Sequence, residues 1–387
     1  MLRAMSLATS VLFLLWAPAL ADNPSDLEAN AALKYWQAFA TLPKFTDTEG
    51  QKIFAGFLTM PLDAHAKEIV AKAEYALKMM HYGAALPRCE WGMPYEEGVD
   101  MLLPQGPAAR LLTSIACMRA RMHFEQGQNA KAIDDLLANF TLGRQISKNG
   151  INIIVLVGYG IEHRTGETLA RYLPKLSPEA IKDVKRRIDA LPAGGNPAAA
   201  VKFEEKSALD WFVRKVKEAK DKEGLLNFLA LVSQVTGPEG EKHDWQEKAR
   251  GFLESCGGTP EGVLKKAEEV RGAYARLAKM LELPLDQFEK EWEELTQKQS
   301  ANVVFKALFP AYQKLRWQQA RAEVRSALLT AAIAVQLEGR DALKNHADPV
   351  SGGLFEYTAF DGGFELHSKL KGPDDKPLTL TVGARGK

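Results

Sequence analysis

The sequence predicts an almost entirely α-helical fold, an irregular array of helical hairpins that ends in a small β-hairpin. Apolar residues recur at helical spacing through most of the chain. Helix-start signals such as Ser177-Pro178-Glu179 and Thr259-Pro260-Glu261 divide it into short segments. After Gly339 the pattern changes to alternation of apolar and polar residues around a tight turn. These three observations together indicate helical pairs followed by strands.

The first helices are expected near the amino terminus. Ser25-Asp26-Leu27-Glu28 forms a capping box, in which the serine and glutamate satisfy free backbone donors at a helix start. It opens a helix that runs toward Pro43. A second apolar-periodic stretch runs from about Leu62 to Tyr82, and a proline-rich loop follows it.

The most regular part of the chain predicts a helical hairpin. Gly127 breaks the pattern, and each side of it carries one apolar stripe and one polar face. Neither helix would be stable alone, so the two are expected to pack together. The stripes consist of Leu111, Ile115, Met118 and Met122 before the break, and of Ile133, Leu136, Leu137 and Phe140 after it.

The second half of the chain continues in the same way. Asn196-Pro197 opens a long charged helix, and a last helix carries the stripe from Val324 to Val335. In the tail, Asp361-Gly362-Gly363 makes a tight turn between two alternating segments, which predicts the β-hairpin. An isolated β-hairpin is only marginally stable in water, so this one should pack on the helical body.

The amino terminus has the three-part layout of a secretory signal. Arg3 is followed by the apolar run Leu7 to Trp16 and by the small-residue site Ala19-Leu20-Ala21. We expect cleavage after Ala21 and a periplasmic or secreted protein. The predicted division is a signal peptide at 1–21, a helical-hairpin domain at 22–192, a second helical domain at 193–339 and the hairpin tail at 340–387.

The charge balance excludes a broad electrostatic field. The chain has 50 basic and 49 acidic residues, and removal of Arg3 with the signal leaves 49 of each. Such a chain has no general attraction for nucleic acid or anionic lipid. The best later apolar stretch, Ile151 to Ile161, is interrupted by polar and glycine residues, so no membrane span is expected after signal cleavage.

The three cysteines of the chain allow two interpretations in an oxidising compartment. Cys89 and Cys117 are the nearest pair in sequence and can form a disulfide. The alternative is that these two and Cys256 are small buried apolar residues.

Three resemblances follow from local motifs. The stretch from Ala108 to Arg144 resembles a tetratricopeptide-type hairpin, through its glycine-containing turn and the following Ala130-x-Ala132-x-x-Asp134. The chain also looks like a group of exported bacterial helical proteins, a resemblance that implies no activity; it rests on the segments Arg88–Gly92, Ala132–Leu137 and Val157–Glu162. The segment from Ala320 to Ser368 is similar to the C-terminal helix and hairpin of pseudopilins.

Two places are candidate ligand contacts. The loop from Arg88 to Gly92 presents Arg88, Glu90 and Trp91, which either line a groove or cover the helices. Glu162 ends an apolar stretch, so it is expected to pair with an arginine such as Arg119 or Arg121, or else to act as a catalytic acid. The seven histidines show no metal-ligand spacing, and neither a metal site nor a cofactor is expected.

Three functions remain open. The leading hypothesis is a non-enzymatic exported scaffold whose stacked hairpins present a groove to a protein or peptide in the cell envelope. The alternative is an envelope hydrolase that uses paired carboxylates. Its candidate residues are Glu90, Asp134, Asp135 and Glu162. The third is an accessory of a secretion or pilus system that docks through the pseudopilin-like tail.

Overall fold

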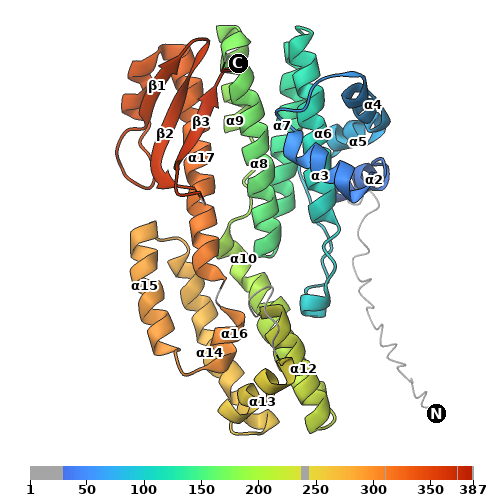
Figure 1. Cartoon of the computed structure of the whole chain (residues 1–387), viewed down its shortest axis with the longest axis vertical. Coiled ribbons are helices and arrows are strands. Elements are labelled where there is room, and N and C mark those ends of the chain that lie inside the picture. Colours follow the sequence, from blue (N-terminus) through green and yellow to red (C-terminus); the bar gives the residue numbers. More distant parts are fainter. Residues whose placement is uncertain (1–28, 237–243, 310, 373, 386–387) are drawn as a thin grey trace, which may run out of the picture.

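The computed structural model describes residues 29–236, 244–309, 311–372 and 374–385. The predicted signal peptide and the capping box at Ser25–Glu28 lie outside these residues. Within them the chain forms sixteen α-helices and one small antiparallel sheet at the carboxyl end (Figure 1). The predicted fold class, mostly helical with a small β-hairpin, is confirmed.

The first half of the chain builds the upper body in Figure 1. Its helices are α2 (Ala31–Ala40), α3 (Asp47–Gly56), α4 (Ala64–Lys72), α5 (Glu74–Ala84), α6 (Gln105–Glu125), α7 (Asn129–Ser147), α8 (Asn152–Tyr172) and α9 (Pro178–Asp189). The stretch expected as one helix near Leu62–Tyr82 is two, because the chain turns at Ala73 between α4 and α5.

The second half forms the lower body and then returns upward (Figure 1). Its helices are α10 (Pro197–Glu204), α11 (Trp211–Glu218), α12 (Lys222–Thr236), α13 (Trp245–Ser255), α14 (Pro260–Met280), α15 (Leu285–Lys298), α16 (Val303–Leu308) and α17 (Tyr312–Glu338). A π-helical segment, Glu205–Asp210, joins α10 to α11.

The predicted hairpin is the pair α6 and α7. Gly127 lies between them with φ +72°, a left-handed backbone conformation that glycine adopts without strain. The apolar stripes of both helices are buried, except for Leu111, which is partly buried. The predicted helix starts are also confirmed, because Ser177, Asn196 and Thr259 each accept a backbone hydrogen bond at the first turn of α9, α10 and α14.

The tail forms the predicted hairpin and one further strand. Strands β1 (Glu356–Phe360) and β2 (Gly363–Lys371) pair across the turn at Asp361–Gly362, and β3 (Pro377–Val382) pairs with the other edge of β2. The buried face of the sheet carries Leu366, Leu370, Leu380 and Val382. This face packs on α8 and α17, which supplies the cover that a small sheet needs.

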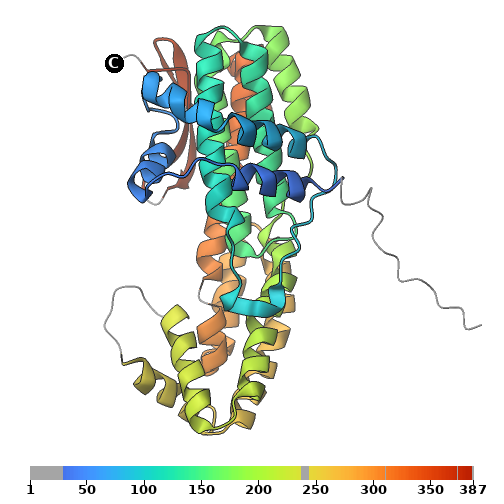
Figure 2. The same ribbon diagram turned by 90° about the vertical axis from the view of Figure 1, so that its right-hand side faces the viewer.

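Three apolar cores hold the molecule together. One lies among α2 to α8, a second among α6 to α9, α17 and the sheet, and a third among α10 to α16 with the start of α17. Helix α17 therefore belongs to both ends of the molecule, and the two views show it running along the long axis (Figures 1 and 2). In the described part of the chain no helix combines the length and apolar character that a membrane span requires.

Candidate functional site

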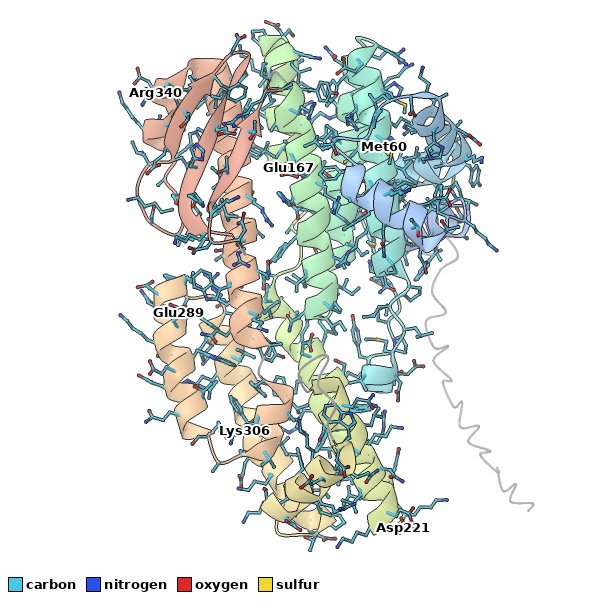
Figure 3. The ribbon with its side chains drawn as sticks, viewed as in Figure 1. Met60, Glu167, Asp221, Glu289, Lys306 and Arg340 are labelled. Carbon is cyan, nitrogen blue, oxygen red and sulfur yellow. The ribbon has the colours of Figure 1, made fainter. Side chains whose placement is uncertain are left out.

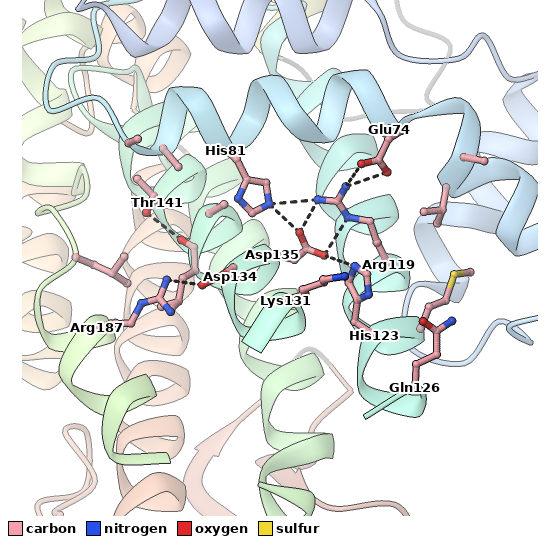
Figure 4. A pocket seen from close by; sticks show the side chains of 18 of the residues that line it. Glu74, His81, Arg119, His123, Gln126, Lys131, Asp134, Asp135, Thr141 and Arg187 are labelled. Atoms are coloured by element: carbon pink, nitrogen blue, oxygen red, sulfur yellow. Dashed lines mark hydrogen bonds and ion pairs between the residues drawn. The ribbon is translucent and has the colours of Figure 1, made fainter. Parts of the chain in front are cut away.

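An open groove on the upper body gathers charged side chains from several helices. Helices α4 and α5 form one side, and α7 and α9 form the other. Residues of α6 form part of its floor, and the volume is about 930 Å³. Figure 4 shows the polar and charged side chains that converge there. We call this feature the α5–α7 groove.

The floor of the α5–α7 groove contains a buried ion pair. Arg119 Nε donates to Asp135 Oδ2 at 3.0 Å, and Arg119 Nη2 donates to Asp135 Oδ1 at 2.5 Å (Figure 4). The Asp135 side chain is only 3% exposed, and that of Arg119 is 11% exposed. Two parallel hydrogen bonds fix the guanidinium in the plane of the carboxylate, so the pair holds α6 and α7 in one register.

Helix α5 joins the same network through Glu74 and His81. Arg119 Nη1 lies 3.1 Å from both carboxylate oxygens of Glu74. His81 Nε2 lies 2.7 Å from Asp135 Oδ1 and 3.2 Å from Arg119 Nη2. Three helices thus share one arginine, and both carboxylates are occupied by cationic or hydrogen-bonding partners.

The network changes the proton affinity of its buried members. Burial alone would raise the pKa of Asp135, but hydrogen bonds from His81 and Arg119 outweigh it and hold the pKa below its ordinary value of 3.8. Burial alone would lower the pKa of Arg119, but Asp135 and Glu74 raise it. Asp135 and Arg119 therefore form a charged pair at neutral pH.

The rim of the groove adds two cations without partners. Asp134 and Arg187 form an ion pair of 2.8 Å between α7 and α9. Lys67 on α4 and Lys131 on α7 also line the groove. Within the described parts of the chain, neither lysine ammonium has an ion pair or a side-chain hydrogen bond, and both residues are exposed. The groove therefore carries an unbalanced positive charge.

The predicted contact loop lies elsewhere and is fixed by internal bonds. The Asn30 side chain accepts from Glu90 N and donates to Glu90 O, both at 2.9 Å. Arg88 lies 3.5 Å from the Glu90 carboxylate in a partly exposed ion pair. Trp91 stacks on Tyr35 and donates from Nε1 to Gln145 O at 3.1 Å. The Trp91 ring covers α2 and the end of α7.

Glu162 has a different partner from those expected. It accepts from Arg144 Nε at 3.2 Å, while Arg119 is bound to Asp135. Arg121 donates to the carbonyl oxygens of Phe57 and Met60, at 3.1 and 2.9 Å. The expected pairing of Glu162 with an arginine is therefore confirmed, but the partner is Arg144 and not Arg119 or Arg121.

The four candidate contacts do not form one site. Glu162 lines a second cavity, between α8 and α17, to which Arg88, Glu90 and Trp91 do not contribute. None of the four lines the α5–α7 groove.

The proposed disulfide is not formed. Cys89, Cys117 and Cys256 are all buried free thiols. Cys117 lies in the α6–α7 hairpin, where it accepts from the Asn139 amide at 3.6 Å, and burial raises its pKa to about 11. The three cysteines serve as small buried residues, the second of the two interpretations.

Most of the groove residues are not singled out by sequence reasoning. The sequence marks Asp134 and Asp135 as carboxylates and Arg119 as a cation partner, but it does not predict the pairing of Arg119 with Asp135. The available signal is a charged residue within each apolar stripe: Arg119 follows Met118, and Asp135 precedes Leu136. Lys67, Glu74 and His81 give no comparable signal.

Comparisons with protein-family models, with curated proteins and with solved structures found no match. In the described residues, no group of three or more histidine, cysteine, aspartate or glutamate side chains is arranged to hold a metal ion. The geometry of the groove itself is thus the basis for a functional proposal.

Proposed function

We propose that the protein is an exported, non-enzymatic scaffold whose α5–α7 groove binds an acidic segment of a protein or peptide in the cell envelope. The observation that carries this proposal is the pairing pattern of the groove. Every other lysine, arginine, aspartate and glutamate that lines it has an ion-pair partner, whereas Lys67 and Lys131 have none among the described residues. Two unpaired ammonium groups at one groove favour an anionic ligand.

The shape of the groove supports an extended ligand. It is open along α5 and α7, and its volume of about 930 Å³ exceeds what a single amino acid fills. Apolar side chains such as Val70, Met122 and Leu137 lie between the charged ones. A peptide that alternates acidic and apolar residues matches this lining.

The carboxylates of the groove are already paired with arginines, which favours a binding function over a catalytic one. A general acid or base needs a carboxylate that is free to exchange a proton with the substrate. Asp135 and Glu74 both accept from Arg119, and Asp134 is paired with Arg187. These carboxylates therefore contribute a rigid surface.

The test compares two peptides of opposite charge. Fluorescein-labelled peptides of repeated Glu-Leu-Gly and repeated Lys-Leu-Gly units are titrated with the mature protein, and fluorescence anisotropy reports binding. We expect the acidic peptide to bind and the basic peptide not to bind. Added salt should weaken the complex, because exposed charges are screened.

Charge reversal identifies the surface that binds. The double variant Lys67→Glu, Lys131→Glu should weaken acidic-peptide binding by about tenfold or more, since it converts two attractions into repulsions. The matched control is Lys279→Glu, Lys306→Glu, which reverses two exposed lysines on α14 and α16 and should bind as the parent does. Equal binding of both peptides, or equal loss in both double variants, would reject the proposal.

A further inference from the structure

A second cavity lies between α8 and α17, beneath the end of the sheet. Its volume is about 630 Å³, within the range of small-molecule sites. Figure 1 shows the two helices side by side, with the strands next to them, and Figure 3 places Glu167 on α8. The lining combines charged side chains of both helices with an apolar surface. We call this feature the α8–α17 cavity.

Arg325 is a part-buried cation that has no protein partner in this cavity. It lies on α17, is part-buried, and in the described chain its guanidinium makes neither a hydrogen bond nor an ion pair. A guanidinium that has lost much of its water without gaining an acceptor is costly. A carboxylate in the cavity would accept two parallel hydrogen bonds from it.

Glu167 is the complementary anion on the other wall. It lies on α8, its side chain is 32% exposed, and its ion-pair contact among the described residues is with His163 Nε2, at 3.7 Å. Burial lowers the pKa of His163 to about 3, so this imidazole is neutral and does not balance the carboxylate. Burial raises the pKa of Glu167, and the charge of Arg325 acts in the opposite direction. The two side chains both line the cavity but form no ion pair with each other in the described structure.

Two further carboxylates of the lining already have partners. Glu323 accepts from Gln319 Nε2 at 3.0 Å and lies 3.5 Å from Arg316 Nη1. Glu162 is already bound to Arg144, at 3.2 Å, so it is not available as a free anion. Ser326 and Thr330 lie on the same helix as Arg325 and line the cavity with it. Thr330 Oγ1 already donates to Ser326 O at 3.1 Å, so of the two hydroxyl groups it is that of Ser326 that can donate to a bound carboxylate.

Another part of the lining is apolar and suits a hydrocarbon side chain. These residues come from α7, α9, α17 and β3, and all belong to the same apolar core or pack against it: Phe140, Ile188, Leu328, Leu329, Ile333 and Leu380. Transfer of an aliphatic or aromatic group from water to this wall is favourable.

We infer that the α8–α17 cavity binds a small zwitterion of the apolar α-amino acid class, with its carboxylate on Arg325, its ammonium on Glu167 and its side chain on the apolar wall. Such a ligand binds Arg325 and Glu167 at the same time, whereas these two side chains form no ion pair with each other. A fatty carboxylate or an alkyl amine would satisfy only one of the two.

The inference is tested by calorimetric titration of the parent protein with L-leucine and L-phenylalanine. Two analogues of leucine accompany them: 4-methylpentanoate, which lacks the amine, and isoamylamine, which lacks the carboxylate. We expect an amino acid to bind and each analogue to bind about tenfold more weakly or worse, because one buried charge of the cavity then stays unpaired. Absence of heat with both amino acids, or an analogue that binds as tightly as leucine, would overturn the inference.

Variants locate the site independently of the analogues. Arg325→Gln and Glu167→Gln should each weaken binding by about tenfold or more, and Lys314→Gln, at an exposed position of α17, should not. Neither Arg325 nor Glu167 makes a short ion pair in the described structure, so both variants should fold, which circular dichroism checks. Parent-like amino-acid binding by both cavity variants would contradict the assignment.

Discussion

Arg119 and Asp135 form a two-point ion pair in the floor of the α5–α7 groove, with Nε to Oδ2 at 3.0 Å and Nη2 to Oδ1 at 2.5 Å. The two residues lie on the paired helices α6 and α7, and the same guanidinium reaches Glu74 on α5. Arg119 therefore joins three helices, and its charge balances that of the buried Asp135, while Glu74 is the more exposed second carboxylate. What remains for a ligand is the unpaired charge of Lys67 and Lys131 at the rim.

Loss of the Asp135 carboxylate should destabilise the fold. Asp135→Asn leaves Arg119 part-buried with Glu74 as its remaining partner, and breaking a buried pair from one side costs about 3 kcal/mol or more. Urea unfolding measures the difference. The control is Asp134→Asn, whose side chain is 51% exposed in its pair with Arg187, and its cost should stay below about 1 kcal/mol. Equal losses in the two variants would show that the buried network does not stabilise the protein.

The contribution of Asp135 should disappear in acid. Its pKa in the folded protein is below the ordinary 3.8, so the folded state releases the proton more readily than the unfolded state. The stabilisation is thus fully present above about pH 4 and is lost as the pH falls toward the folded-state pKa. The difference in unfolding free energy between the parent and Asp135→Asn should shrink over this interval in urea titrations. A difference that stays constant from neutral pH down to this acid range would contradict the assignment of the low pKa.

Gly158 and Gly160 should respond in opposite directions to alanine. A Cβ at Gly158 would lie 2.6 Å from the carbonyl oxygen of Gly143, because α7 and α8 approach closely there. A Cβ at Gly160 would meet nothing within 4 Å. Gly158→Ala should cost about 1–3 kcal/mol through overpacking, and Gly160→Ala should stabilise by up to about 1 kcal/mol through helix propensity. Thermal unfolding of both variants checks the signs, and a destabilising Gly160→Ala would refute the explanation.

The local signals in the sequence predicted local structure well. Ser177, Asn196 and Thr259 cap helices because a side-chain oxygen bonds the backbone only three residues away. The turns at Gly127 and Gly362 are also local signals, because glycine adopts the positive φ of +72° and +84° found there without strain. Strand β3 was not foreseen, because its pattern of Leu378, Leu380 and Val382 is short and gains its buried face only by pairing with β2.

The sequence does not predict which side chains far apart in the chain pair with one another. Glu162 was recognised as a carboxylate in an apolar setting, but its partner Arg144 depends on how closely Gly143 and Gly158 allow α7 and α8 to pack. The Arg88–Trp91 loop presented the residue types of a ligand site, yet its backbone is held by Asn30. The α5–α7 groove combines residues from five helices, and no single segment contains its pattern.

The predicted export is tested by determining the first residue of the mature protein. On expression in a Gram-negative host, the protein recovered from the periplasm should begin at Asp22, as mass spectrometry can determine. The double variant Ala19→Arg, Ala21→Arg replaces both small residues of the cleavage site and should leave an unprocessed precursor. An uncleaved parent chain confined to the cytoplasm would exclude the proposed location.

The occupancy of the α5–α7 groove is measured most directly by photo-crosslinking. A peptide of repeated Glu-Leu-Gly units that carries a diazirine group is irradiated with the mature protein, and the attachment points are mapped by mass spectrometry. We expect adducts on α4, α5, α7 and α9, and their loss in the Lys67→Glu, Lys131→Glu variant. Adducts concentrated on α12 to α16 or on the sheet, unchanged by that variant, would contradict binding in the groove.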